Sequence, residues 1–128
     1  MPKVTKSADC GNSPKNLLVQ ALAIALETAN GAAFSRCTSE EIVWAVPGRR
    51  SFQGRTAALA WLKSKKPDSA RIVVRHITSH GRGGAAEGLL VDDSGLSHGF
   101  CHVMEFASAK GDRVSAIFSY YSDIGEID

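Results

Sequence analysis

The chain has 128 residues, about the usual size of one domain, and its hydrophobic fraction of 44% and charged fraction of 22% are ordinary for a globular protein. The formal net charge is only +2 and the charged residues are dispersed, which argues against a nucleic-acid-binding protein with a dense basic stripe. No run of apolar residues approaches the roughly 20 that a membrane-spanning helix needs, so we expect no membrane partner.

Three cysteines, Cys10, Cys37 and Cys101, form an odd set without a CxxC spacing. Secreted domains held by disulfides usually contain an even set, so this pattern favours a reducing compartment. Residues 1–15 are polar and lack the apolar core of a signal peptide. These observations lead us to expect a cytoplasmic protein.

The first predicted element is a helix near the N-terminus. Residues 1–12 are polar and show no period, so we expect a flexible tail followed by a single domain over residues 13–128. Ser13 is a favourable residue for capping a helix N-terminus. Apolar residues then recur at helical spacing, which predicts a helix over about 14–30 that is closed by Gly31.

Shorter elements follow the first helix. A helical turn is weakly signalled over 32–37, and residues 41–46 then alternate like a short strand that ends at a Pro-Gly turn. The next stretch, 54–66, has an apolar stripe at helical spacing and lysines near its C-terminal end, where they suit the helix dipole. We therefore expect a further helix there.

From residue 71 onward the hydrophobic period changes from helical to alternating. We expect four strands, over about 71–80, 84–92, 97–107 and 112–122. Each of the three connections contains a glycine that can adopt a positive φ, and links this short imply antiparallel neighbours. Helices that are segregated from an antiparallel sheet define an α+β fold.

Histidines provide the first candidates for chemistry. All four fall on the predicted sheet, at His76, His80, His98 and His102. If the middle hairpin closes across residues 93–96, Glu87 lies opposite His102. A neutral imidazole beside a carboxylate in a partly dry site can act as a general acid–base pair. The same imidazole could equally be a hydrogen-bonded interior group among aromatic side chains.

The sequence shows no motif for a metal, a phosphate group or a covalent nucleophile. Histidines four residues apart on one strand are about 13 Å from each other, too far to share one ion, although a site shared between strands stays open. There is no GxSxG motif, and the glycines at 81–84 do not lie between a strand and a helix. We therefore predict no metal and no cofactor.

The last predicted strand is apolar on both faces. Phe118 and Tyr120 lie on one face, and Ile117 and Tyr121 lie on the other. A terminal strand that is apolar on both sides is expected to be covered on both sides. One face then meets the helices and the other meets a second subunit, which predicts a homodimer through the outer face of the sheet.

Several short strings, in their order and spacing, resemble the nuclear transport factor 2-like superfamily, in particular its SnoaL-like and ketosteroid-isomerase-like enzymes. The strings are WAVPG at 44–48, FQG at 52–54, AWL at 60–62, HGFCHVMEF at 98–106 and AIFSYYSDI at 116–124. The resemblance covers about residues 14–125. It implies a cone formed by a strongly curved sheet wrapped against the helices, with a deep apolar pocket at its open end. It also implies a dimer through the outer face of the sheet, which is common in that superfamily.

The resemblance further implies which side chains face the pocket. His102 falls where ketosteroid isomerases carry an acidic residue of their oxyanion hole, and Tyr121 falls where they have a pocket-lining aromatic. This register turns Phe118 and Tyr120 outward, although hydrophobic matching of the last hairpin alone would place those two inside. We expect His102 and Glu87 to be catalytic. The expected ligand-binding residues are Trp44, His76, Leu89, His98, Phe100, Ile117, Ser119 and Tyr121.

Two departures from the isomerases argue against steroid isomerisation. Their carboxylate base aligns with Ala45, and the tyrosine that they use on the first helix has no counterpart here. One hypothesis is therefore an isomerase, cyclase, dehydratase or hydrolase that acts on a small apolar or aromatic molecule by proton transfer at His102. The alternatives are a non-catalytic binding protein with the same pocket, and a protein-interaction module with a residual cavity.

Overall fold

Helix α1 spans Pro14–Thr28 and lies against the sheet. The computed structural model describes residues 2–6, 13–65 and 69–122. Ser13 caps the helix as expected, because its side-chain oxygen accepts a hydrogen bond from the Asn16 backbone N–H at 3.1 Å. The helix closes at Ala29, whose φ of 54° is left-handed. The prediction that Gly31 closes it is wrong, since Gly31 begins the next helix.

Two shorter helices complete the helical part. Helix α2 (Gly31–Cys37) is capped by the side chain of Asn30 and confirms the helical turn that was weakly signalled. Helix α3 (Arg55–Ser64) lies within the predicted stretch. It packs against strand β2 (Thr38–Val46), while α2 packs against α1.

Six further strands are β1 (Lys3–Lys6), β3 (Arg50–Gln53), β4 (Arg71–His80), β5 (Gly83–Val91), β6 (Ser97–Phe106) and β7 (Val114–Tyr121). The four strands predicted after residue 71 are confirmed, each to within two residues at its ends. Strands β1 and β3 were not predicted, because four mostly exposed residues are too few for hydrophobic alternation to mark a strand. The expected tail is therefore wrong for residues 3–6, and residues 7–12 lie outside the described part of the chain.

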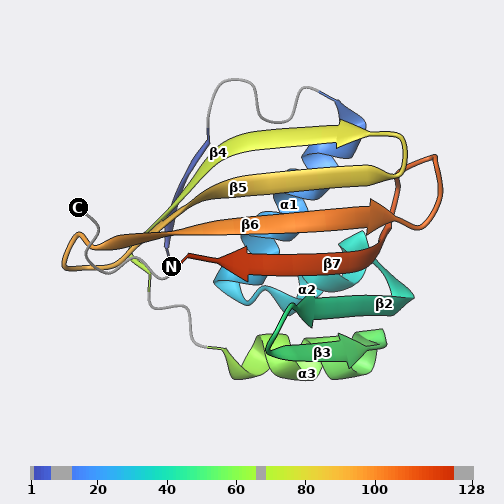
Figure 1. Ribbon diagram of the computed structural model, residues 1–128, viewed down its shortest axis with the longest axis horizontal. Helices are drawn as coiled ribbons and strands as arrows, with labels where there is room; N and C mark the ends of the chain where they lie inside the picture. Colours follow the sequence, from blue (N-terminus) through green and yellow to red (C-terminus); the bar gives the residue numbers. More distant parts are fainter. Residues whose placement is uncertain (1, 7–12, 66–68, 123–128) are drawn as a thin grey trace.

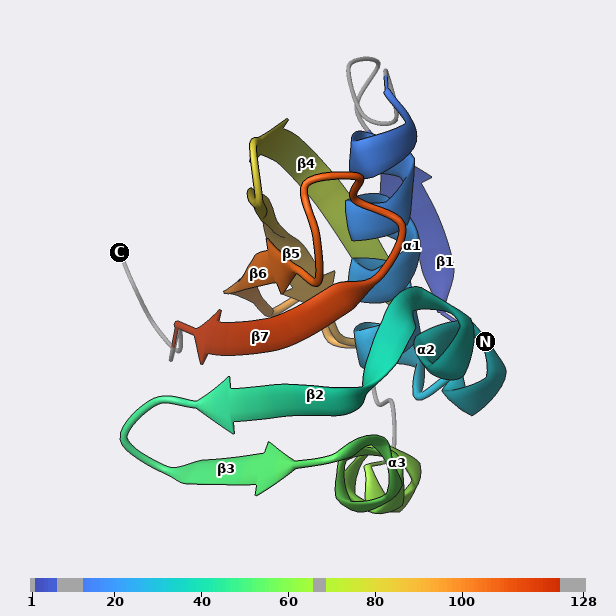
Figure 2. The same cartoon turned by 90° about the vertical axis from the view of Figure 1, so that its right-hand side faces the viewer.

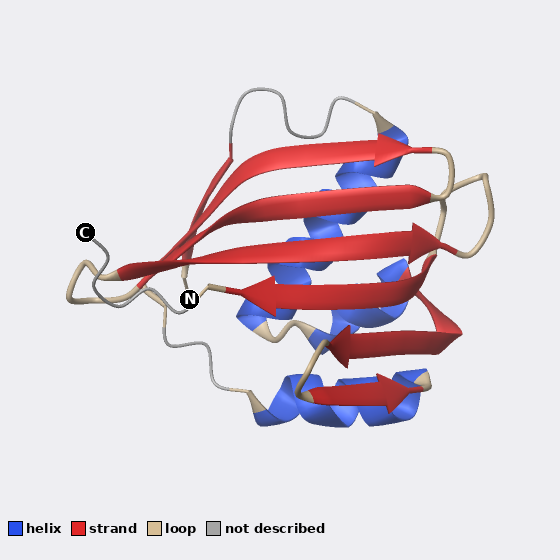
Figure 3. Cartoon of the chain, viewed as in Figure 1, coloured by secondary structure: helices blue, strands red, loops and turns tan. Residues whose placement is uncertain are grey.

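The strands form one sheet of seven in the order β1-β4-β5-β6-β7-β2-β3 (Figure 1). The outer pair β1–β4 and the pair β2–β7 are parallel, and the other four pairs are antiparallel. Figure 3 shows the three helices gathered on one side of this sheet. The predicted α+β class with a mostly antiparallel sheet is confirmed.

The sheet is strongly curved, and Figure 2 shows it bending around α1. Strand β4 contains a bulge between Val74 and His76, where its register against β5 shifts. Opposite this bulge, a Cβ at Gly88 would collide with the backbone carbonyl of Val73. Glycine thus allows the two backbones to approach closely where the strand bends.

The hydrophobic core lies between the concave face of the sheet and the helices. Leu22 and Leu26 of α1 are buried there together with Trp44 of β2 and Met104 of β6. The opposite, outer face of the sheet has no helix over it among the described residues (Figures 1 and 2). The site can therefore be sought on the inner face, where the helices and the curved sheet meet.

Candidate functional site

A carboxylate from α1 lies at the centre of the site. The side chain of Glu27, in the last turn of α1, is only 6% exposed. Sequence reasoning missed this residue, although α1 carries no other acidic side chain and Glu27 directly follows the buried Leu26. That signal could have revealed it, because a carboxylate among buried apolar residues must find hydrogen-bond partners.

Those partners come from the far end of the chain. His102 on β6 is fully buried, and its Nε2 lies 2.7 Å from Oε2 of Glu27. Its Nδ1 lies 2.7 Å from Oγ of Ser119 on β7. Ser119 Oγ in turn accepts a hydrogen bond of 2.9 Å from Trp44 Nε1. Four buried polar side chains from three strands and one helix thus form a continuous chain.

The donors and acceptors in this chain determine how His102 holds Glu27. The indole N–H of Trp44 can only donate, so it occupies one acceptor site on the Ser119 oxygen. The Ser119 hydroxyl keeps its hydrogen and a second acceptor site, and either can pair with Nδ1 of His102. A carboxylate can only accept, so Nε2 of His102 carries a hydrogen and donates it to Glu27. Both ring nitrogens of the buried imidazole therefore have a hydrogen-bond partner.

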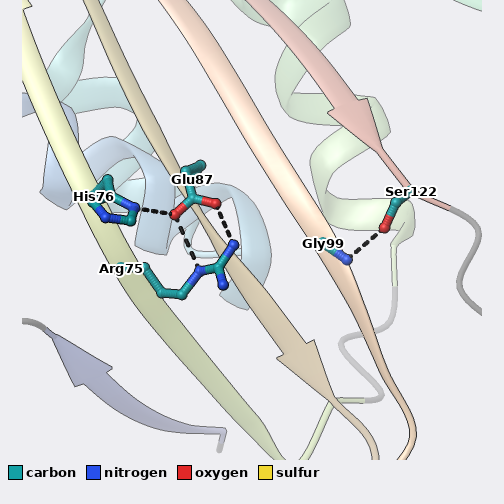
Figure 4. A network of polar contacts seen from close by, with 5 residues as sticks. All are labelled: Arg75, His76, Glu87, Gly99 and Ser122. Carbon is teal, nitrogen blue, oxygen red and sulfur yellow. Dashed lines mark hydrogen bonds and ion pairs between the residues drawn. The ribbon is translucent and has the colours of Figure 1, made fainter. Parts of the chain in front are cut away.

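Tyr121 supplies a second hydrogen bond to Glu27. Its hydroxyl donates to Oε2 at 2.8 Å, so this oxygen receives both Tyr121 and His102. Burial raises the pKa of the Tyr121 phenol, and the adjacent charge of Glu27 raises it further. Directly after Tyr121, Ser122 Oγ accepts a hydrogen bond of 2.7 Å from the Gly99 N–H, which holds the end of β7 beside β6 (Figure 4).

The carboxyl group of Glu27 has a lowered pKa. Burial by itself raises the pKa, because it disfavours the charged form. Four interactions lower the pKa and outweigh the effect of burial: the hydrogen bond and the charge of His102, the charge of Lys65 and the hydrogen bond from Tyr121. Glu27 is therefore ionised at neutral pH despite its burial.

A pocket of about 330 Å³ opens beside Glu27 and Tyr121. Its apolar wall comes from α1 and the residue that caps it, and from β2, α3 and β5: Leu26, Ala29, Val46, Trp61 and Leu90. The polar part of the lining also contains three cationic side chains, the imidazole of His98 and a serine; the cations are Arg49, Arg50 and Lys65, and the serine is Ser69. Lys65 Nζ lies 5.3 Å from the ring centre of Trp61 and 5.8 Å from that of Tyr121.

Five of the predicted site residues lie on the inner face of the sheet. Phe100, His102, Ile117 and Ser119 are buried on the inner face, and Tyr121 reaches Glu27 from the same face. Of the predicted ligand-binding residues, only His98 and Tyr121 line the pocket itself. Phe100, Ile117 and Ser119 do not line this pocket and are buried behind the residues that do, together with Trp44.

The expected pairing of Glu87 with His102 is wrong. Ala86 lies opposite His102, and Glu87 lies opposite Cys101 on the outer face of the sheet. There Glu87 binds Arg75 at 2.7 Å and His76 Nδ1 at 2.6 Å (Figure 4). The hydrogen bond from Arg75 lowers the pKa of Glu87. The partner of His102 is Glu27, from the helix.

The loop between β5 and β6 has one residue more than the prediction assumed, and this explains the wrong pairing of Glu87. A closure across 93–96 predicts a two-residue loop, whereas Asp92 pairs with Leu96 through a backbone hydrogen bond of 3.0 Å, which leaves three residues in the loop. Gly95 takes the left-handed position with φ of 90°, as three-residue hairpin loops require. A shift of one residue moves every side chain of β5 to the opposite face.

Two other expectations, those for His76 and Leu89, fail for related reasons. His76 lies on the outer face with its side chain 78% exposed, because the bulge turns it outward beside Arg75. Leu89 alternates with Leu90, and Leu90 is the one that lines the pocket. Ala45 pairs with the outward-facing Phe118, so the position aligned with the isomerases' base faces away from the pocket.

Two other properties concern the described residues as a group. They contain no cluster of three or more His, Cys, Asp or Glu side chains that could hold a metal ion. None of the helices they form is long and apolar enough to cross a membrane. Of the three cysteines, Cys37 and Cys101 are free thiols, and Cys10 lies outside the described residues. Burial raises the pKa of both free thiols.

The strongly curved sheet, with helices on its concave face and a pocket beside α1, is the nuclear transport factor 2-like fold, as the sequence resemblance implied. A nuclear transport factor 2-like protein of unknown function from Burkholderia xenovorans LB400 superposes with a TM-score of 0.72 at 19% identity, over 89% of this chain and 87% of that one.

Two further solved structures share the fold. A candidate ketosteroid isomerase from Kribbella flavida DSM 17836 matches with a TM-score of 0.72 at 14% identity, over 89% of this chain and 82% of that one. A candidate isomerase of the SnoaL-like family from Agrobacterium tumefaciens strain C58 matches with a TM-score of 0.69 at 15% identity, over 86% of this chain and 99% of that one. No family model matches the sequence, and no curated protein matches it. At such low sequence identity these superpositions establish the fold alone, so the function has to be inferred from the residues of the site.

Proposed function

We propose that the protein is an enzyme of isomerase or cyclase type, which moves a proton on a small apolar or aromatic molecule bound in the pocket, with Glu27 as the general base. The observation that carries the proposal is the state of Glu27. Its carboxylate lies in the wall of the pocket, almost fully buried, ionised, and held by two hydrogen bonds on one oxygen.

The two oxygens of Glu27 have different roles in this proposal. Oε2 accepts hydrogen bonds from His102 and Tyr121, whereas no described residue hydrogen-bonds Oε1. Oε1 is therefore the oxygen that can take a proton from a ligand. His102 is a positioning residue, because it is fully buried behind Glu27 and fixes the carboxylate without lining the pocket.

In the proposed reaction, Oε1 of Glu27 takes a proton from a carbon next to a carbonyl group of the ligand, and the electron pair of the broken C–H bond moves toward the carbonyl oxygen. The protonated Glu27 then returns the proton to another atom of the same molecule. No atom is gained or lost, as an isomerase or an intramolecular cyclase requires. A well-placed base of this kind contributes about 10²- to 10⁴-fold to a rate.

The test follows the proton. The small molecule that co-purifies with the protein is identified by mass spectrometry and incubated with the protein in D₂O, and deuterium incorporation is measured with time. Glu27→Gln should slow incorporation by about 100-fold or more, because an amide cannot accept the proton. Glu105→Gln, an exposed carboxylate lost from the outer face, is the control and should leave the rate unchanged. Equal rates for wild type and Glu27→Gln would refute the proposal.

Non-catalytic binding is the second candidate, and one observation favours it. The pKa of Glu27 is lowered, and a carboxylate with a low pKa is a weak base at neutral pH. A pocket protein that only binds its ligand would retain the ligand in both variants and show no deuterium incorporation in either or in the wild type.

We also propose that two copies associate through the outer face of the sheet. Val103 and Tyr120 lie on that face and are 39% and 49% exposed. Apolar groups of this size on a face that no described helix covers suit a symmetric contact between copies. Sedimentation equilibrium should give a dimer for the wild type and a monomer for Tyr120→Glu. A wild-type monomer at micromolar concentration would contradict the dimer.

A further inference from the structure

Among the described residues, three cations and one carboxylate line the pocket. Arg49, Arg50 and Lys65 contribute to the lining, and Glu27 is the acidic member. Glu27 is already satisfied at Oε2 by His102 and Tyr121. The whole chain carries 15 basic and 13 acidic residues, so this local excess of positive charge is not a general property of the surface.

The cations have unused capacity for an anion. Among the described residues, salt bridges form at Glu87, with Arg75 and His76, and between His102 and Glu27. None of the three pocket cations takes part in one. Arg50 and Lys65 instead lie against the ring of Trp61, with the guanidinium carbon of Arg50 at 5.8 Å and Lys65 Nζ at 5.3 Å from its centre.

Two separate elements bring these charges together. Arg49 ends the turn between β2 and β3, where its N–H donates a hydrogen bond of 2.9 Å to the Val46 carbonyl, and Arg50 begins β3. Lys65 is the residue that ends α3. Placing like charges around one pocket is unfavourable, unless an opposite charge enters and neutralises them.

The pocket therefore has three chemical regions. The cations form one region, the ring of Trp61 with Leu90 forms an apolar wall, and Glu27 provides the reactive group. A ligand anion would be repelled by the carboxylate of Glu27 and attracted by the cations. An adjoining hollow of about 550 Å³, lined in part by Arg49 and His98, extends the space on the side of the arginine.

We infer that the ligand is an amphipathic anion, a small apolar or aromatic compound whose carboxylate or similar acidic group is held by Arg49, Arg50 and Lys65 while its apolar body lies along Trp61. This substrate class deepens the proposed function and rests on it for the reaction. Binding, however, needs no turnover, so the two can be tested apart.

Two dyes that differ by one charge provide the test. The sulfonate 8-anilinonaphthalene-1-sulfonate and its neutral counterpart N-phenyl-1-naphthylamine share the same aromatic body, and both fluoresce more strongly on entering an apolar site. In fluorescence titrations the wild type should bind the sulfonate at least tenfold more tightly than the neutral dye. Added salt should weaken the binding of the sulfonate and leave that of the neutral dye unchanged, because salt screens the attraction between charges.

Two double variants separate the pocket from the rest of the surface. The double variant Arg49→Gln and Arg50→Gln should bind the sulfonate at least tenfold more weakly than the wild type and bind the neutral dye equally well. The double variant Arg36→Gln and Arg71→Gln removes the same charge from exposed positions outside the pocket and should leave the affinity for both dyes unchanged. Glu27→Gln removes the carboxylate that repels the sulfonate, so it should bind the sulfonate at least as tightly as the wild type, and a failure of catalysis would not be mistaken for a failure of binding.

Four results would overturn the inference. The wild type could bind both dyes equally, it could bind neither, or the Arg49 and Arg50 double variant could bind the sulfonate as well as the wild type does. The fourth is an equal loss in the Arg36 and Arg71 control, which would mean that overall charge, and not the pocket, attracts the sulfonate. If the dyes behave as expected while Glu27→Gln still exchanges deuterium at the wild-type rate, the substrate class stands and the proposed base is wrong.

Discussion

Glu27 and His102 are 75 positions apart in the chain, and their side chains meet at 2.7 Å where they are only 6% and 0% exposed. One belongs to the first helix and the other to a strand in the second half of the chain. The contact therefore ties the helix layer to the sheet by a charged hydrogen bond. It also sets the direction in which the carboxylate faces the pocket, which makes it the first contact to test.

We expect His102→Ala to destabilise the protein by about 3–5 kcal/mol, because it leaves the buried carboxylate of Glu27 without one of its two partners. Urea denaturation at pH 7 measures the free energy of unfolding. His80→Ala, at an exposed strand end, is the control and should change stability by about 0.5 kcal/mol or less.

If His102→Ala does not fold, Ser119→Ala tests the same network more gently. It leaves the Trp44 indole N–H and His102 Nδ1 unpaired, and we expect a loss of about 1–3 kcal/mol. A loss no larger than that of the His80 control would show that the network contributes little to stability. A positioning role for His102 further predicts that Ser119→Ala shifts the pH–rate profile of deuterium exchange.

The pH dependence of stability should report Glu27. Its pKa is lower in the folded protein than the ordinary value of 4.5, so its contribution is present above pH 4.5 and is lost as the pH falls through the folded-state pKa. The excess stability of wild type over Glu27→Gln should therefore be largest near neutral pH and shrink below pH 4.5. Denaturant titrations from pH 7 to pH 3 measure it, with Glu105→Gln as the variant that loses an exposed carboxylate. An excess that stays constant over this range would contradict a lowered pKa.

Tyr121→Phe should cost about 1.5 kcal/mol, because it removes one hydrogen bond to an ionised group while keeping the ring. It should also raise the pKa of Glu27, since one interaction that favours the charged form is lost. Tyr120→Phe is the matched control, because the neighbouring phenol points to the outer face and should leave both quantities unchanged. Thermal or urea denaturation of the two variants distinguishes the faces directly, and equal effects would mean that the register of β7 is wrong.

Gly88→Ala should destabilise the protein by about 3 kcal/mol, because the added methyl group meets the backbone of Val73, which cannot move without breaking the pairing of β4 with β5. Gly83→Ala, at the start of the same strand, meets only one backbone atom, at 3.8 Å, and serves as the control. The two free energies of unfolding, measured by urea denaturation, should differ by about 2 kcal/mol or more. A tolerated alanine at Gly88 would show that the close approach of the strands is not required.

Local patterns in the sequence predicted the three helices, five of the seven strands that the described residues form, and much of the sidedness of those strands, whereas β1 and β3 were missed. Hydrophobic alternation located β4 to β7, because a strand repeats every two residues and each repeat can be seen locally. The same alternation places His102 with Phe100, and Ser119 with Tyr121. The resemblance then chose correctly which of the two faces is the inner one.

The contacts between side chains of different elements became visible only in the folded domain. Glu87 missed His102 because the register of a hairpin depends on one loop residue, and His76 turned outward because a bulge interrupted the alternation. Glu27 entered the site because α1 packs into the curve of the sheet, and that contact joins residues far apart in the chain. Local periodicity carries no information about such contacts, since they depend on loop lengths and packing angles that are settled only when the whole domain folds.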